Sequence, residues 1–200
     1  MLARQDVLAT LRMVQEENLD VRTVTLGINL NVCASRDPDA LVAAVRARIA
    51  TLARDLVQVC NESAARYGLP IVNKRLAISP ASILLEGHTP ATAVRLAQAL
   101  DEAAAAVQVD LLGGFSAFVQ KGITPGERVL IESLPEALAR THRVCASVNV
   151  GSTRAGVNVD AVRLLADRIL AAAQASRDQR GFACAKLVVF CNAAEDNPFM

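Results

Sequence analysis

The chain has 200 residues and a formal net charge of +1, with 21 basic and 20 acidic side chains. Hydrophobic residues make up 52% of it and charged residues 20%, which excludes a disordered protein. Balanced charge and 3% aromatic content exclude a basic, aromatic-rich surface for nucleic acid. No apolar stretch approaches the roughly 20 residues of a membrane span. We therefore expect a single domain over residues 1–200 with neither a nucleic-acid nor a membrane partner.

The cysteines indicate a reduced protein. There are five of them, an odd number, and no CxxC pair occurs. Only two histidines, His88 and His142, are available, so a zinc finger is excluded. We expect buried, reduced thiols in the cytoplasm, with neither a metal centre nor a cofactor.

The first half of the chain alternates between helical and strand periodicity. Alternating residues before Gly27 indicate a strand with a bulge or bend at this glycine. Asp37-Pro38 and Thr89-Pro90 each read as an N-cap followed by a first-turn proline, and Gly68 reads as a helix end. The predicted elements are a helix over 5–17, a strand over 21–32, a helix over 38–67, a strand over 71–78 and a helix over 90–107.

The second half continues the same alternation. The Gly113-Gly114 pair is predicted to end a short strand, and residues 115–121 to form a helical turn or loop. The predicted elements are a strand over 109–112, a short strand or helix lead-in over 128–132, a Ser133-capped helix over 135–140, a strand over 143–149, a helix over 158–176 and a strand over 186–192. The last strand is almost wholly apolar, which predicts cover on both of its faces.

Strands that alternate with helices predict an α/β fold with parallel βα units and right-handed crossovers. Both an open doubly wound sheet and a barrel fit five such units, although the chain is shorter than the ~250 residues of a complete eight-stranded barrel. In either case the strands should end at one common edge. We expect Asn29, Gly113, Asn149 and Asn192 to lie at that edge.

Ligand sites in parallel α/β proteins lie at the carboxyl ends of the strands. The residues that follow the predicted strands are rich in amides, hydroxyls and cations, although loops are polar for other reasons as well. The resulting candidate residues for binding a ligand or anion are Asn29, Asn31, Gly113, Gly114, Lys121, Asn149, Ser152, Thr153, Arg154 and Asn192. No catalytic residue can be assigned.

The segment GSTRAG, residues 151–156, is the most specific of these. Its two glycines allow close backbone approach, and Ser152, Thr153 and Arg154 offer donors just before a predicted helix. It contains neither a Walker motif nor GxGxxG. Both an anion contact and a purely structural turn are compatible with it.

Five segments together carry a family resemblance: ENLDVRTVTLGINL, YGLPIVNKRLAISP, VDLLGGFSAFVQKG, VCASVNVGSTRAGVNVDAV and FACAKLVVFCNAAEDNPFM. In combination they resemble the UPF0210 family, also called DUF711, whose members are uncharacterised and substantially longer. The resemblance implies that this chain is the N-terminal part of such a protein. It also implies a five-stranded half of an α/β barrel similar to that of pyruvate formate-lyase and other glycyl radical enzymes, although the glycyl radical motif itself is absent.

Two functions are therefore open. One is an enzyme-like binder of a small anionic metabolite at the strand ends; whether it catalyses a reaction is undecided. The other is a non-catalytic ligand sensor or regulatory subunit that works with an ACT-domain protein, a partner implied by the resemblance alone. The resemblance also implies homodimers. An apolar last strand with no following element to cover it likewise predicts self-association.

Overall fold

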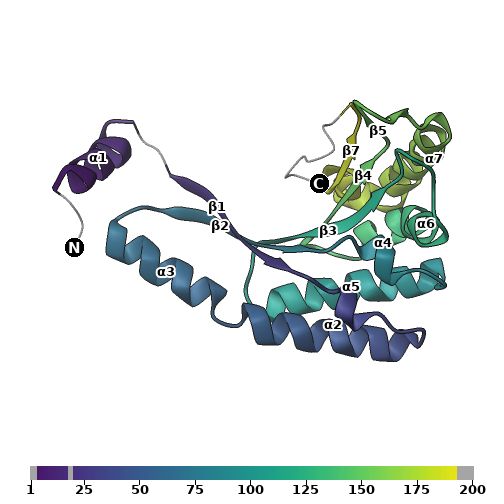
Figure 1. Ribbon diagram of the computed structural model, residues 1–200, viewed down its shortest axis with the longest axis horizontal. Helices are drawn as coiled ribbons and strands as arrows, with labels where there is room; N and C mark the ends of the chain where they lie inside the picture. The colour runs from purple at the N-terminus through teal and green to yellow at the C-terminus, as the bar shows by residue number, and fades with distance from the viewer. Residues whose placement is uncertain (1–3, 18–19, 193–200) are drawn as a thin grey trace.

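The computed structural model describes residues 4–17 and 20–192. Its main element is a five-stranded parallel sheet, which confirms the predicted α/β class and the parallel pairing (Figure 1). The strands, in their order across the sheet, are β1 (Val21–Ile28), β2 (Ile71–Ile78), β3 (Leu111–Phe118), β4 (Val144–Asn149) and β7 (Leu187–Phe190). A small antiparallel hairpin, β5 (Gly151–Ser152) with β6 (Gly156–Val157), follows β4.

Helices connect the strands. They are α1 (Arg4–Gln15), α2 (Pro38–Ala53), α3 (Leu56–Tyr67), α4 (Ala81–Leu84), α5 (Pro90–Ala106), α6 (Pro125–Ala139), α7 (Val159–Ala175) and α8 (Phe182–Ala185), with 3-10 turns at Asn31–Cys33 and Arg177–Gln179. Among the described residues, none of these helices has the length and apolar character to cross a membrane.

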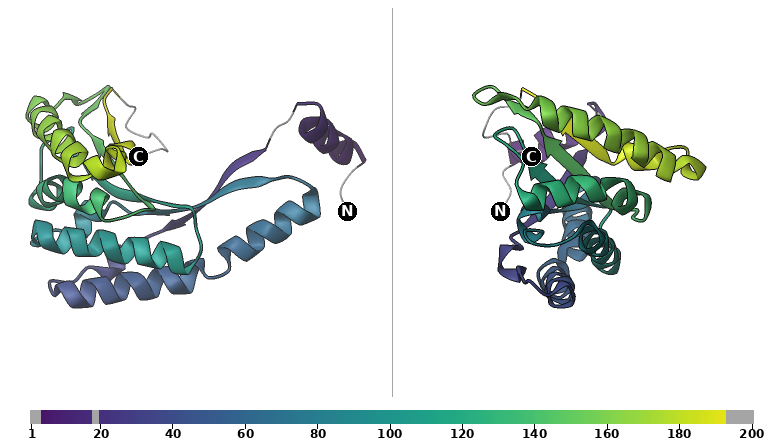
Figure 2. Two further views of the ribbon diagram at one scale, coloured as in Figure 1. Left: turned by 180° about the vertical axis from the view of Figure 1, so that it is seen from behind. Right: turned by 90° about the vertical axis from the view of Figure 1, so that its right-hand side faces the viewer.

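The core lies between the sheet and one layer of helices. Helices α2, α5, α6 and α7 pack side by side along one face of the sheet (Figures 1 and 2). Side chains alternate across a strand, so Val144, Ala146 and Val148 of β4 point into this layer and are at most 3% exposed. Most of the buried aliphatic side chains form one cluster here.

The opposite face of the sheet, the helix-free face, is covered by none of the described helices (Figure 2). Small and polar side chains occupy it. The strand register aligns Ser116, Ser147 and Val188 across three neighbouring strands, and Arg75 with Thr25 across two others. The last strand, predicted to be covered on both faces, is instead an edge strand with Val188 48% and Val189 38% exposed.

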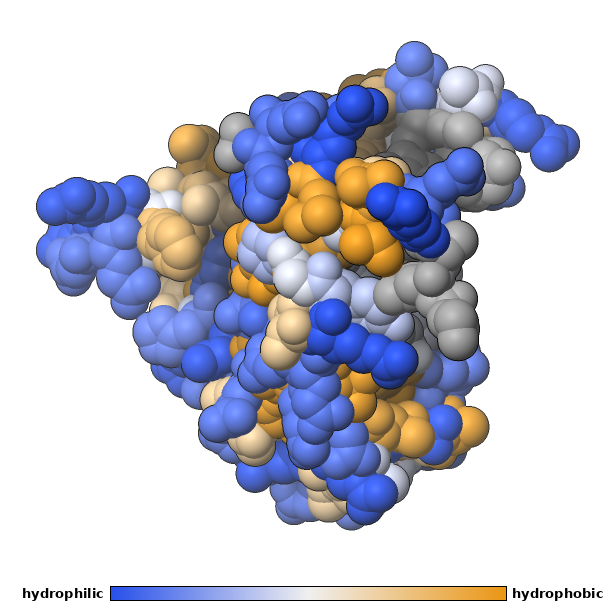
Figure 3. All heavy atoms as spheres, turned by 90° about the vertical axis from the view of Figure 1, so that its left-hand side faces the viewer, coloured by the Kyte–Doolittle hydropathy of each residue, from blue (hydrophilic) through white to orange (hydrophobic). Residues whose placement is uncertain are grey.

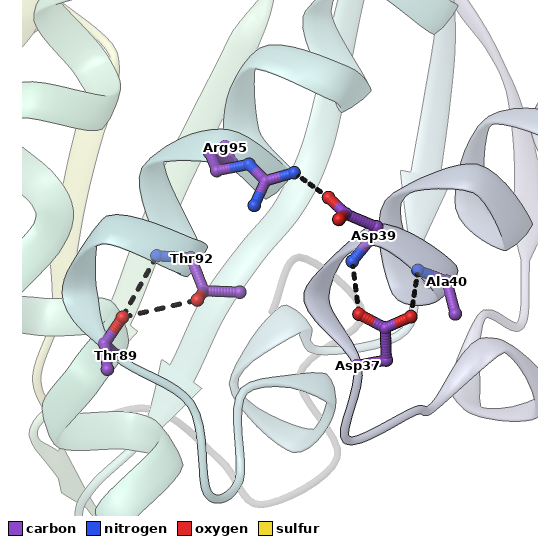
Figure 4. A network of polar contacts seen from close by, with 6 residues as sticks. All are labelled: Asp37, Asp39, Ala40, Thr89, Thr92 and Arg95. Atoms are coloured by element: carbon purple, nitrogen blue, oxygen red, sulfur yellow. Dashed lines mark hydrogen bonds and ion pairs between the residues drawn. The ribbon is translucent and has the colours of Figure 1, made fainter.

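The predicted caps of α2 and α5 are confirmed (Figure 4). The Asp37 carboxylate accepts hydrogen bonds from the amides of Asp39 and Ala40, and Thr89 Oγ1 accepts one from the amide of Thr92. Arg95 of α5 forms an ion pair with Asp39 of α2, which joins the two helix starts. Both helices therefore begin with capped amides beside the carboxyl ends of the strands.

The prediction of one long helix over 38–67 is wrong. The helix is interrupted at Arg54 and Asp55, which divides it into α2 and α3. The two halves have different partners: α2 packs on α5, and α3 packs on β2. The break allows α3 to follow the arm that β2 and β1 form beyond the body (Figure 1). Viewed from the arm end, the surface carries hydrophobic patches between hydrophilic residues (Figure 3).

Two further predictions, both for residues after 109, are wrong. The strand predicted over 109–112 extends to Phe118, because the register shifts at Gly113-Gly114 and pairing then resumes. A bulge or bend is expected at Gly27, but no bulge occurs there, because β1 runs beside β2 in unbroken register and ends at Ile28. A single helix, α6, replaces the short strand and the short helix predicted over 128–140.

Helix α6 begins at a capping box that the sequence analysis missed. Thr124 Oγ1 accepts the amide hydrogen of Glu127, and the Glu127 carboxylate accepts that of Thr124. Pro135 lies inside this helix. An interior proline costs about 3 kcal/mol, which the burial of Leu130, Ile131 and the other apolar side chains of α6 offsets.

Candidate functional site

A groove of about 610 Å³ lies at the carboxyl ends of β3 and β4. Two loops line it: the turn after β3, which carries Gln120 and Lys121, and the segment after β4, which carries Arg154, Ala155 and Asn158. The fold thus brings together two predicted anion-binding cations, Lys121 and Arg154, that are 33 residues apart in the sequence. We call this the Lys121–Arg154 groove.

Asn158 fixes the geometry of the groove. Its side-chain oxygen accepts the Ala161 amide and so caps the 17-residue helix α7. Its Nδ2 donates to the Val119 carbonyl at 2.7 Å, which joins the start of α7 to the turn after β3. The positive end of the α7 dipole therefore lies beside the two cations.

The hairpin β5–β6 presents Arg154. Ser152 is only 3% exposed, and its Oγ accepts the Ala155 amide across the turn at 3.1 Å. Thr153 and Arg154 are exposed at the tip. Of the three donors predicted from the sequence, Ser152 shapes the turn, and Thr153 and Arg154 face solvent.

Gln120 is a member of the groove that the sequence analysis missed. Its Oε1 atom is buried and accepts no hydrogen bond within the described residues. A buried acceptor without a donor is costly, so Gln120 places an unsatisfied polar group beside the groove. Nothing in the local sequence marks Gln120, because its role depends on the turn that follows β3.

The predicted asparagines lie at the same end of the sheet but do not converge. Asn149 ends β4, is 3% exposed and accepts the Gly151 amide through Oδ1. Asn192 follows β7 with a φ of 58°. Asn29 and Asn31 follow β1, where Asn29 Oδ1 accepts the Asn31 amide. Since β1 is three strands from β4, about 14 Å away, these two do not share a small ligand with Arg154.

The prediction that Gly113 and Gly114 lie at the rim is wrong. They lie within β3, where Gly113 pairs with Ala77. Together with Arg75, Ser116, Cys145 and Ser147 they line a second cavity, of about 230 Å³, on the helix-free face. The sequence analysis could not assemble this set, because the register of four strands brings it together.

Three side chains have displaced pKa values, and burial is the main cause in each case. Burial raises the pKa of the Cys145 thiol, against the opposing charges of Lys186 and Arg75. Burial also raises the pKa of Cys33, with Arg48 acting in the opposite direction. Burial lowers the pKa of Lys186, whose Nζ donates to the carbonyls of Leu138 and Thr141. All five cysteines are free thiols, as predicted, but only Cys33 and Cys60 are buried; Cys145 and Cys184 are partly exposed and Cys191 is exposed.

The fold and groove define a parallel α/β protein with a cationic groove at the carboxyl ends of its strands. The family described as "Uncharacterised ACR (DUF711)" matches residues 12–200, and the chain belongs to that family. It is 51% identical over 200 residues to a UPF0210 protein of Desulfovibrio desulfuricans and 52% identical over 200 residues to one of Syntrophobacter fumaroxidans. A UPF0210 protein of Clostridium beijerinckii is 50% identical over 195 residues.

These matches cover 98–100% of this chain and 43–44% of the relatives. The chain therefore spans less than half the length of the curated relatives it matches.

Proposed function

We propose that this DUF711 chain binds a small phosphate- or carboxylate-bearing metabolite in the Lys121–Arg154 groove. The observation that carries the proposal is the convergence of two cations, from loops after different strands, in one groove beside the N-terminus of α7. A guanidinium grips two anionic oxygens at once, an ammonium adds charge, and a helix N-terminus favours an anion.

Calorimetric titration with a panel of phosphates and short carboxylates tests this proposal. We expect one class to bind, and Arg154→Ala to weaken its binding by about 1.5–3 kcal/mol, the range for hydrogen bonds to charged groups. Arg22→Ala is the matched control, because the Arg22 side chain is 80% exposed on β1 and pairs only with Asp20 among the described residues. Equal affinity in the wild type and Arg154→Ala would refute the assignment.

The same titration separates the enzyme-like function from the regulatory one. Conversion of the bound compound to a product would support an enzyme. Stable binding without turnover would favour the ligand sensor, and pull-down with an ACT-domain protein would then be the next test.

We also propose that the sheet is one half of a barrel similar to that of pyruvate formate-lyase. Three observations support this: the five strands are parallel, the described helices cover one face only, and the relatives are more than twice as long. A structure of a full-length relative tests it. A second parallel sheet opposite the helix-free face would support the barrel, and helices packed on that face would refute it.

A further inference from the structure

The cavity on the helix-free face is separate from the Lys121–Arg154 groove and belongs to a different part of the fold. It lies over the middle of the sheet, between β2 and β7, at the point where the β3 register shifts. We call it the sheet hollow. Its volume of about 230 Å³ is below the roughly 300–1,000 Å³ of pockets for drug-sized ligands, so a ligand of few heavy atoms fits it.

Small side chains create the hollow. Larger residues would fill the surface at this point, but the lining contains Gly113, Ala77, Ser116 and Ser147. A Cβ added at Gly113 would meet nothing within 4 Å, so the space above this residue is open. At Gly114 a Cβ would lie 2.3 Å from the Ile78 carbonyl oxygen, so β2 and β3 approach closely beneath the hollow.

Arg75 gives the hollow its charge. It is the one ionised side chain in the lining, and Arg75 Nε donates to Thr25 Oγ1 at 3.1 Å. No carboxylate of the described residues forms an ion pair with this guanidinium. The hydroxyl of Ser147 adds a donor beside it, whereas the Ser116 hydroxyl donates to the Gly114 carbonyl at 3.3 Å. One end of the hollow is therefore complementary to a single carboxylate.

The other side of the hollow is apolar. Val188 and Phe190 of β7 lie across it from Arg75. The thiol of Cys145 lies between the cationic and apolar sides, on the strand that separates β3 from β7. This thiol is partly buried, and burial raises its pKa, which keeps it protonated near neutral pH.

We propose that the sheet hollow is a binding site for a small monocarboxylate with a short apolar tail. The Arg75 guanidinium binds the carboxylate through two nitrogens, Ser147 donates to it, and the tail packs on Val188 and Phe190. The Cys145 thiol then lies beside the ligand's carbon chain. The site is independent of the proposed groove, because the two share no lining residue.

Cys145 offers a direct readout, because two thiol reagents of nearly equal size differ in charge. Iodoacetate carries the carboxylate that Arg75 would bind, and iodoacetamide does not. Both react with the thiolate, so their rate ratio at Cys145 is independent of the thiol pKa. The ratio is measured on the Cys145 peptide by mass spectrometry at about pH 9, relative to the ratio for free N-acetylcysteine.

We expect this relative ratio to be about tenfold above that of N-acetylcysteine, the effect of one charge-assisted contact. Arg75→Gln should lower it severalfold toward the N-acetylcysteine value, with the charge of Lys186 still acting on Cys145, and Arg22→Gln, a remote change of the same charge, should leave it unchanged. Propionate should slow the iodoacetate reaction at Cys145, and propionamide should not. An unchanged ratio in a folded Arg75→Gln variant would overturn the proposal.

If Arg75→Gln does not fold, a second variant still tests the proposal. Gly113→Val places methyl groups in the open space of the hollow without a clash at its Cβ. It should abolish protection by propionate while Arg75 is intact. Failure of propionate to protect Cys145 in the wild type would also overturn the proposal, whatever calorimetry shows for the Lys121–Arg154 groove.

Discussion

The two faces of the sheet differ in what their side chains do. On the helix-covered face, aliphatic side chains such as Leu76, Leu112 and Val148 are fully buried. On the helix-free face, the register brings glycines, serines, a cysteine and an arginine into a hollow. Adjacent residues of one strand point to opposite faces of the sheet. One residue therefore contributes to the buried core, and its neighbour contributes to the hollow.

The sharpest test of this difference uses two neighbouring leucines. Leu112 is 0% exposed on the helix-covered face, and Leu111 is 38% exposed beside it. We expect Leu112→Ala to lower the free energy of unfolding by about 3 kcal/mol through lost burial and a cavity. Leu111→Ala should cost less than about 1 kcal/mol. Urea unfolding measures both, and equal losses would contradict the assignment of the two faces.

The glycine pair in β3 gives a second matched comparison. Gly114 has a φ of 106°, and its Cβ would collide with the Ile78 carbonyl. Gly114→Ala should therefore cost at least about 2 kcal/mol. Gly113→Ala meets open space and should be neutral or slightly stabilising. If thermal melts show the same loss for both variants, the bulge is not where the structure places it.

Lys186 is a buried cation that lines neither the Lys121–Arg154 groove nor the sheet hollow, and we expect it to stabilise the fold. It is 6% exposed, and its ammonium donates to main-chain carbonyls at the end of α6. Lys186→Met leaves these carbonyls without a donor and should cost about 2 kcal/mol near neutral pH.

The pH dependence of this loss has a definite sign. Burial lowers the pKa of Lys186 in the folded chain below the ordinary 10.5. Between the two values the unfolded chain binds more protons, so the folded state gains stability as pH rises through that window. The difference in free energy of unfolding between wild type and Lys186→Met should grow from neutral pH toward pH 10.5. A difference that is flat or shrinks would contradict this account of the buried ammonium.

Much of the fold could be predicted from the sequence, because hydrophobic periodicity and cap residues act locally. Asp37-Pro38 and Thr89-Pro90 mark true helix starts. The errors occur where tertiary packing outweighs a local signal. Gly113-Gly114 reads as a strand end but is a bulge held by β2, and Ser133 reads as the cap of a new helix but lies, with Pro135, inside α6.

The candidate site was predictable in part. Lys121 and Arg154 could each be chosen from position alone, since both follow predicted strands. Their meeting in one groove depends on β3 and β4 being neighbours in the sheet. Arg75 and Cys145 could not be chosen, because they lie within strands and become a site only through register. Self-association of the chain stays a prediction.

The central claim is that the Lys121–Arg154 groove binds an anion, and an NMR titration of the amide groups with inorganic phosphate and, separately, with acetate tests it most directly. The account predicts progressive shifts for residues 120–122, 154, 155 and 158, which line the groove. These shifts should be lost in Arg154→Ala, and residues 113–116 in the sheet hollow should not respond to phosphate. Absence of shifts in the groove with both anions, or shifts that persist unchanged in Arg154→Ala, would contradict the claim.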